Sequence, residues 1–356
     1  MVISQVCSHE PQGNKVLTRA LSYDRKSSMI TGIGSLPFRN VDEALDLIFS
    51  VCREAPFWPQ LPQRSFLEDM YVQSLYPMPG LVINETERTA YVDTDRTEGI
   101  EQFYENVSAE NIEAFPIFEP AAPAFYRFLE RLPELGDGAR MVKGQLTGPF
   151  TIGLGLKDGS GKPILYDEGW FDIVKKTLNM RARWMVAAIK KLYPDKEVML
   201  FFDEPFMVSF GSAYVSVSKE EAVGLMNEVV EGIDATVGIH CCGNTDWSVL
   251  FEVQTDIVNY DAFNFMETIF YFKAELGRFL ARGGRISPGI IPTTHEGLAL
   301  ATPVDLEGLW DTFVALATRA GIDVTPEDRV VTPSCGLGSV ADADARKAFD
   351  LLRRFA

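Results

Sequence analysis

The chain has 356 residues, of which 46% are hydrophobic, and its 50 acidic side chains outnumber the 33 basic ones to give a net charge of −17. This acidity argues against nucleic-acid binding, because few cations are left to neutralise phosphates. No run of about 18 apolar residues occurs, so we expect no membrane-spanning helix. The sequence also begins without a secretion signal, and its 5 cysteines are scattered, which favours a cytoplasmic protein without disulfides.

The first half of the chain mixes strand and helix patterns with proline-rich segments. We expect residues 1–28 to be an N-terminal extension and residues 29–356 to form one domain. Within that domain, 29–35 has the pattern of a strand and 41–55 the apolar spacing of a helix. Residues 56–62, "PFWPQLP", are predicted to be extended.

The segment after this extended stretch looks like an insertion. Residues 80–95 have the alternation and turn residues of a hairpin, and 101–134 are predicted to be largely helical. The insertion carries no motif that points to a particular chemistry.

The second half is more regular and decides the predicted fold. Helical patterns such as 168–192, 218–232 and 302–320 separate several of its strand candidates. These strand candidates lie at 141–148, 197–205, 235–242, 256–263, 285–292 and 328–335. With 29–35 and 56–62 the strands number eight, which predicts a TIM (β/α)8 barrel. A doubly wound sheet is the competing fold, but "GIGSLP" does not have the spacing of its Gly-rich phosphate loop.

Polar and sulfur-bearing side chains follow several predicted strands at the point where each strand ends. In a barrel these carboxyl ends share one face, where barrel enzymes have their active sites. The residues placed there are Ser35, Asp203, Glu204, His240, Cys242 and Cys335.

"HCC" at 240–242 has the spacing of a metal site. Residues i and i+2 of a strand point to the same side, so His240 and Cys242 face one point and Cys241 faces away. Imidazole and thiolate suit zinc, and Cys335 is the expected third ligand, which leaves an open fourth position typical of catalytic zinc. The alternative is a buried histidine and buried cysteines in an ordinary core.

"FFDEP" places two carboxylates, Asp203 and Glu204, at another strand end. The pair can bind an ammonium group, act as acid and base, or hold a metal, and a helix cap or turn is an equally good reading. Ser35 in "TGIGSLP" can present its hydroxyl to a carboxylate, and the alternative there is an ordinary glycine turn.

Taken in order, "TGIGSLP", "KGQLTGPFTI", "FFDEP", "HCC" and "TPSCGLG" resemble the catalytic barrel of cobalamin-independent methionine synthase. That family belongs to the superfamily that includes uroporphyrinogen decarboxylase. The resemblance runs from about residue 30 to the C-terminus. "HCCGN" is also similar to the corrinoid-dependent coenzyme M methyltransferases.

The resemblance implies roles for individual residues. His240, Cys242 and Cys335 match the family's zinc ligands, and Glu267 is the nearest match to a fourth, glutamate ligand. Asp203 matches the aspartate that binds the amino group of homocysteine.

Two further substrate contacts follow from the same resemblance. Ser35 matches the serine near the carboxylate of homocysteine, and Glu68 is the nearest residue to a second acidic contact with the amino group. The resemblance thus makes Asp203 and His240 the residues expected to support catalysis.

The implied activity is zinc-dependent methyl transfer to a homocysteine-like thiol, giving methionine. In the family an additional N-terminal half handles a folate donor, and this chain has no room for it. We therefore expect the donor to be either methyltetrahydrofolate or a methyl-corrinoid protein. The alternatives are a uroporphyrinogen decarboxylase-like enzyme, a corrinoid-dependent methyltransferase acting on another thiol, and a zinc-binding scaffold without catalysis.

Overall fold

The computed structural model describes residues 29–322 and 330–356. The expected N-terminal extension, residues 1–28, therefore lies outside the described residues. Across the described part of the chain, none of the helices combines the length and hydrophobicity needed to cross a bilayer.

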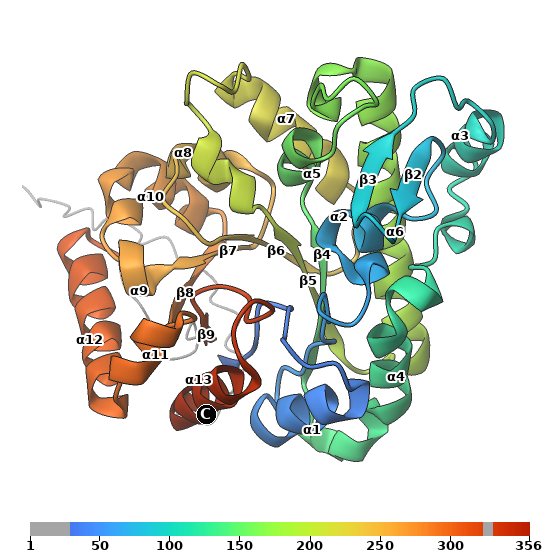
Figure 1. The fold of residues 1–356 in the computed structure, drawn as a ribbon. Helices are drawn as coiled ribbons and strands as arrows, with labels where there is room; N and C mark the ends of the chain where they lie inside the picture. Colours follow the sequence, from blue (N-terminus) through green and yellow to red (C-terminus); the bar gives the residue numbers. More distant parts are fainter. Residues whose placement is uncertain (1–28, 323–329) are drawn as a thin grey trace, which may run out of the picture.

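A curled sheet of seven parallel strands forms the centre of the molecule (Figure 1). Its order is β1-β9-β8-β7-β6-β5-β4, so strands that follow one another along the second half of the chain are neighbours in the sheet. The strands are β1 Met29–Ile30, β4 Met141–Thr147, β5 Glu197–Asp203, β6 Thr236–Cys241, β7 Ile257–Asp261, β8 Arg285–Ile291 and β9 Val330–Pro333. The predicted α/β class and parallel sheet are confirmed.

The eighth strand expected at 56–62 does not form, and neither does a continuous closed barrel. This segment lies between β1 and β4 but makes isolated bridges only, from Phe57 to Lys143 and from Gln60 to Ser35. Three prolines interrupt it, and proline has no N–H with which to extend a ladder. The strand expected at 29–35 is likewise short, because pairing with β9 ends at Ile30.

The helices cover the outside of the sheet, as the apolar spacing predicts. Their ends have clear local causes: Asp167 caps α6, and capping boxes begin α7 at Ser218 and α12 at Thr302. The helices are α1 Val41–Val51, α2 Met70–Leu75, α3 Ile100–Ser108, α4 Pro123–Arg131, α5 Pro149–Gly155, α6 Glu168–Leu192, α7 Lys219–Val230, α8 Trp247–Glu252, α9 Ala262–Phe265, α10 Lys273–Ala281, α11 His295–Leu300, α12 Pro303–Arg319 and α13 Asp342–Leu352.

The predicted hairpin at 80–95 and the largely helical segment after it are also confirmed. The hairpin consists of β2 Leu81–Asn84 and β3 Thr89–Val92, paired antiparallel. Short 3-10 turns link α3 to α4 and occur elsewhere between the larger elements. They are η1 Phe66–Glu68, η2 Ile112–Ala114, η3 Glu119–Ala121, η4 Leu132–Gly138, η5 Ile164–Tyr166, η6 Pro205–Ser209, η7 Thr268–Tyr271 and η9 Arg353–Phe355.

The main hydrophobic core lies between the sheet and its helices and includes residues from Ile30 to Phe355. A second, smaller cluster contains Met141, Met199 and Phe201, which belong to alternating positions of β4 and β5. These positions face away from the helices because side chains alternate along a strand. On this face the apolar side chains lie beside two buried polar ones of β4, Lys143 and Gln145, which are in register with Met199 and Phe201.

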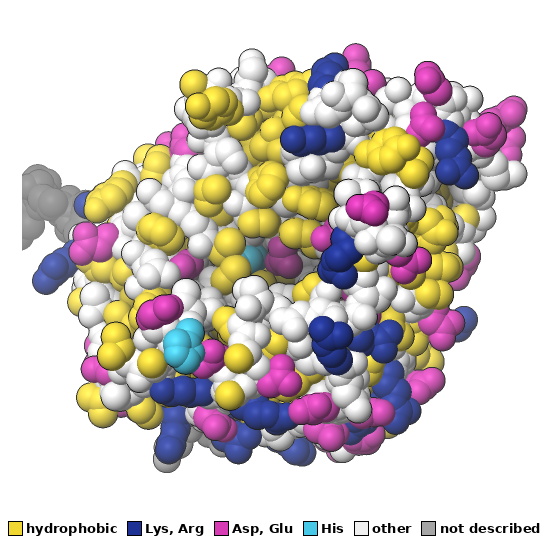
Figure 2. All heavy atoms as spheres, viewed as in Figure 1, with side chains coloured by type: hydrophobic (Ala, Val, Ile, Leu, Met, Phe, Trp, Pro, Cys, Tyr) yellow, Lys and Arg dark blue, Asp and Glu magenta, His cyan; other side chains and the backbone are white. Residues whose placement is uncertain are grey.

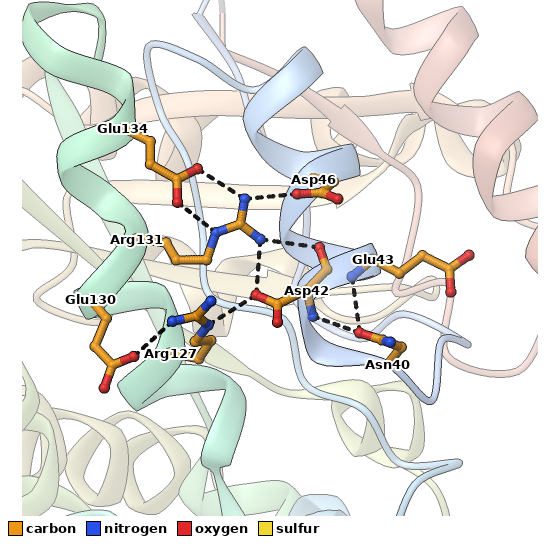
Figure 3. A network of polar contacts seen from close by, with 8 residues as sticks. All are labelled: Asn40, Asp42, Glu43, Asp46, Arg127, Glu130, Arg131 and Glu134. Carbon is orange, nitrogen blue, oxygen red and sulfur yellow. Dashed lines mark hydrogen bonds and ion pairs between the residues drawn. The ribbon is translucent and has the colours of Figure 1, made fainter.

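On the outer surface, α1 and α4 are joined by a network of charged side chains (Figure 3). Arg131 pairs with Asp42, Asp46 and Glu134 at 2.7–3.0 Å, and Arg127 pairs with Asp42 at 2.9 Å. The carboxylates of this network are about half exposed or more, which limits each ion pair to a small stabilisation.

Candidate metal centre

The site is built on a row of residues that runs across the sheet near the carboxyl ends of its strands. In the parallel register Thr147 lies beside Asp203, Asp203 beside His240, His240 beside Asn259, and Asn259 beside Ser287. Neighbours in register point to the same face of a sheet, so these side chains converge. Seen from this side, the molecular surface has a central hollow with histidine and acidic side chains at its floor and many hydrophobic ones around it (Figure 2).

Asn259 fixes the orientation of the His240 ring. The Asn259 Nδ2 donates to the Ser287 carbonyl at 2.8 Å and to the Thr332 hydroxyl at 2.9 Å, so its Oδ1 is the atom that faces His240. That oxygen lies 2.6 Å from the His240 Nδ1, which must therefore carry a proton and donate it. The Nε2 atom, buried and without a hydrogen-bond partner in the described structure, is left with its lone pair free.

The structure brings His240, Cys242 and Cys335 together. One ligand atom from each lies within 4.8 Å of the other two. Cys241 points the other way, as strand alternation predicts: it is buried, and its thiol donates to the Gly243 carbonyl. The two cysteines of the group are free thiols.

This donor set fits zinc, which prefers imidazole nitrogen and thiolate sulfur. A hydrogen bond between the two thiols lowers the pKa of Cys242, and the same contact with Cys242 raises the pKa of Cys335. Burial acts to lower the pKa of His240, but the neighbouring Cys242 and Asp203 outweigh it and raise this pKa. The buried pocket thus favours a cation between the imidazole and the sulfur atoms.

Asp203 lies beside this group at the end of β5. Its Oδ1 is buried and has no hydrogen-bond partner in the described structure, and burial raises the pKa of Asp203 to about 6. A buried lysine, Lys143, lies deeper on β4, where its ammonium donates to the Ile33 carbonyl and faces the Phe201 ring at 4.8 Å. Burial lowers the pKa of Lys143 to about 8, while the charge of Asp203 opposes that shift.

Glu204 has a structural role at the start of α5. Its carboxylate accepts hydrogen bonds from the Phe150 and Thr151 backbone N–H groups and from the Thr151 hydroxyl, at 2.6–2.9 Å. Gly148 is needed beside it, since a Cβ there would lie 2.3 Å from the carboxyl group. Both oxygens of Glu204 are therefore occupied, and of the two carboxylates in "FFDEP" only Asp203 keeps an unpaired oxygen.

Ser35 is bound to the loop that carries Cys335. Its hydroxyl accepts a hydrogen bond from the Gly338 N–H at 3.2 Å, and its carbonyl accepts one from the Leu337 N–H at 2.8 Å. A Cβ at Gly336 would lie 2.1 Å from the Ser35 hydroxyl, so the close approach requires glycine. Ser35 thus contributes to the position of Cys335 in addition to any contact with substrate.

The two remaining acidic candidates do not join the group of His240, Cys242 and Cys335. Glu68 is buried on η1, where its carboxylate pairs with Arg64 at 2.7 Å. Glu267 is exposed, and its carboxylate accepts a hydrogen bond from the Tyr271 hydroxyl at 3.4 Å.

Two residues of the site were not anticipated from the sequence, Asn259 and Lys143. Both are fully buried on strands whose neighbouring residues are mostly apolar. A polar residue at an inward position of a central strand is the signal that would have marked them, because a polar group is buried only where it has partners.

Comparison with known proteins assigns no family. No protein-family model and no curated protein sequence matches the chain. Among solved structures, it is similar to a B12-independent methionine synthase from Shewanella sp. W3-18-1 in complex with selenomethionine, with 16% identity and a TM-score of 0.43. That match covers 64% of this chain and 65% of the other, so this chain spans about two thirds of the neighbour's length.

Two further structures show the same level of similarity or less. One, described as a vitamin-B12 independent methionine synthase from Listeria monocytogenes, has 16% identity and a TM-score of 0.42 over 65% of this chain and 68% of the other. Another, described as an alpha-L-fucosidase from Bacteroides thetaiotaomicron, has 13% identity and a TM-score of 0.27, over 67% and 63%. At these values the likeness carries no assignment of family or activity.

Proposed function

We propose that this protein is a zinc-dependent S-methyltransferase that methylates a homocysteine-like thiol. The observation that carries the proposal is the convergence of His240, Cys242 and Cys335 on one point, with the His240 Nε2 unpartnered. One imidazole and two thiolates are three ligands, and three protein ligands with an open position are typical of a catalytic zinc site. The motif resemblance to cobalamin-independent methionine synthase supports the same reading.

Zinc bound by these three residues would supply an open position at which a substrate thiol loses its proton and stays nucleophilic. Such help is needed because a free thiol has a pKa of about 8.5 and is mostly protonated at neutral pH. In the reaction, the bond from the methyl carbon to the acceptor sulfur forms while the bond to the donor breaks. The donor leaves with that electron pair, and the thiol proton goes to solvent.

The chain's own residues have distinct parts in this scheme. Asn259 holds the His240 ring in the tautomer that leaves Nε2 free, and the loop docked on Ser35 places Cys335. The unpaired Oδ1 of Asp203 is suited to accept a hydrogen bond from the ammonium group of an amino-acid thiol. Orienting the substrate in this way is a proximity contribution to the rate.

The first test is the metal content of protein purified without added metal, for the wild type, Cys335→Ser and Cys241→Ser. We expect about one zinc per chain in the wild type, loss of zinc in Cys335→Ser, and retention in the matched control, because the Cys241 thiol points away from the group. A folded wild type that neither contains zinc nor takes it up would contradict the proposal.

A second measurement separates catalysis from a purely structural metal. Cobalt replaces zinc in the wild type, and its visible spectrum is recorded with and without homocysteine. A change in the sulfur-to-cobalt bands on adding the thiol indicates an exchangeable position, whereas an unchanged spectrum favours the zinc-binding scaffold.

The methyl donor is tested separately, with methylcobalamin and methyltetrahydrofolate each offered together with homocysteine. Formation of methionine from one of them identifies the donor class. The decarboxylase alternative needs cations for an acidic tetrapyrrole, but of the nearest arginines Arg64 is paired with Glu68 and Arg39 is exposed. Tetrapyrrole binding without methyl transfer would favour that alternative.

A further inference from the structure

A cavity of about 340 Å³ lies outside the sheet, between α3, α6 and the segments around 77–79 and 114–118. These elements are at the right of Figure 1. The walls are largely apolar and include Phe103 and Phe115, whose rings meet edge to face at a centroid distance of 5.5 Å. Gln102 and Asn106 of α3 add two amide side chains to the lining.

Among the described residues that line the cavity, Arg181 alone has a charged side chain, and it is only 1% exposed. One of its nitrogens, Nη1, donates to the Ser74 carbonyl at 2.7 Å, while Nε is buried without a hydrogen-bond partner. No carboxylate pairs with this guanidinium among the described residues, and none lines the cavity there. Burial lowers the pKa of Arg181 to about 10, so the side chain is still a cation at neutral pH.

A buried cation without an anionic partner is costly, and natural proteins keep such groups where a partner or ligand completes them. The other arginine near this point of α6, Arg183, pairs with Glu110 at 3.3 Å. In a chain with a net charge of −17, carboxylates are abundant, yet none of those in residues 29–322 and 330–356 lines the cavity beside Arg181.

We infer that this cavity is a binding site for a small organic carboxylate with an apolar body, held by the Arg181 guanidinium. The fork of an arginine matches the two oxygens of a carboxylate. A single positive charge in the lining suits a monoanion better than a phosphate dianion. The phenyl and proline walls suit an aromatic or aliphatic body, as in other small-molecule pockets.

The test uses calorimetric titration of the full-length protein with acetate, benzoate, octanoate and 3-phenylpropionate, and with 3-phenylpropionamide as the neutral match. We expect saturable binding of at least one carboxylate with an apolar body, weaker binding of acetate, and binding of the amide about tenfold or more weaker than that of 3-phenylpropionate. The amide loses a charge-assisted hydrogen bond, and tenfold corresponds to about 1.4 kcal/mol.

Variants locate the binding. Arg181→Gln should weaken carboxylate binding about tenfold or more, whereas Arg183→Gln, two residues away on the same helix, should leave it unchanged. Ala114→Trp provides a second variant that keeps Arg181: Ala114 is exposed at the rim of the cavity, and the indole fills the space. Arg181→Gln can fail to fold, because the Ser74 carbonyl loses its donor. In that case Ala114→Trp still tests whether the ligand binds in this cavity.

Three results would overturn the inference. They are no saturable binding of any of these carboxylates up to about 10 mM, equal binding of acid and amide, and binding that Ala114→Trp leaves unchanged. The last would place the ligand elsewhere, for example at the metal centre. The inference is independent of the proposed methyl transfer, since its readout is binding and not turnover.

Discussion

The polar network between α1 and α4 and the polar group on the concave side of the sheet differ in burial and in how completely their polar atoms are paired. On the surface, Arg131 is matched by three carboxylates, and each of them stays largely in water. On the sheet, the His240 Nε2 and the Asp203 Oδ1 are buried and have no hydrogen-bond partner in the described structure.

The two arrangements differ in what they cost the folded protein. Satisfied surface pairs cost little to make and contribute little, whereas a buried polar atom without a partner costs about 1–3 kcal/mol. A fold that retains such atoms side by side with two thiols gives up stability at that place. Binding of a cation and of a charged substrate group would recover it.

The largest expected effect concerns Lys143, the buried cation below the site. Its pKa of about 8 in the folded state lies below the ordinary lysine value of 10.5, so between these values the unfolded chain holds more protons. The free energy of unfolding should therefore rise with pH across this window, by on the order of 3 kcal/mol, and Lys143→Met should remove that rise. Urea unfolding of both proteins from pH 7 to pH 10.5 measures it.

Parallel pH dependences for the wild type and Lys143→Met would contradict this prediction. They would mean that contacts in the folded protein offset the burial of the Lys143 charge as fully as the carboxylates offset the charges of the surface arginines. Lys175→Met is the matched control, because Lys175 lies on α6 in an ion pair with Glu228.

The next effect tests whether Asn259 orients His240. Asn259→Leu removes the acceptor of the His240 Nδ1 proton, and the ring then loses its fixed tautomer. Loss of such a contact to a metal-binding histidine typically weakens metal affinity about 10–100-fold. Competition with a coloured chelator measures this loss. The control is Asn179→Leu, which removes the hydrogen bond from the Asn179 amide to the Val229 carbonyl, far from the group. Metal affinity should not change in this variant. An equal loss of metal affinity in both variants would indicate a general effect on folding.

A smaller effect is expected for Glu204, the acidic residue whose carboxylate is fully used. Glu204→Gln places an amide N–H₂ against the donors of Phe150 and Thr151, which should lower the free energy of unfolding by about 1–3 kcal/mol. Metal content should not change, since Glu204 is not in the ligand group. The control for the loss of one negative charge is Glu220→Gln, at an exposed position of α7. Loss of zinc in Glu204→Gln would contradict the purely structural role of Glu204.

Much of this arrangement followed from periodicity along the chain. Strand alternation correctly predicted that Cys241 turns away from His240 and Cys242, and the apolar spacing of 168–192 gave the exact bounds of α6. These features depend on the local sequence alone, so the pattern is sufficient to predict them.

Other features depend on contacts between distant segments. The sequence left Glu204 open as a partner of Asp203 or as a helix cap, and only the structure shows that its carboxylate accepts hydrogen bonds from the first turn of α5, more than fifty residues earlier in the chain. The contact between Asn259 and His240 could not be predicted from the sequence, because it depends on the strand register that places the two residues side by side. The failed strand at 56–62 is an exception, because its prolines already argue against a regular ladder.

The smallest expected effect concerns Arg131, in the surface network between α1 and α4. Arg131→Gln removes three ion pairs, yet the free energy of unfolding should fall by no more than about 1 kcal/mol, because the partner carboxylates are solvated. The loss should shrink further in about 1 M salt, which screens exposed charges. Chemical unfolding at low and high salt measures both effects. A loss of stability as large as that of Glu204→Gln, and unchanged by salt, would contradict this prediction. It would show that solvent exposure does not make the ion pairs of the surface network weaker than buried polar contacts.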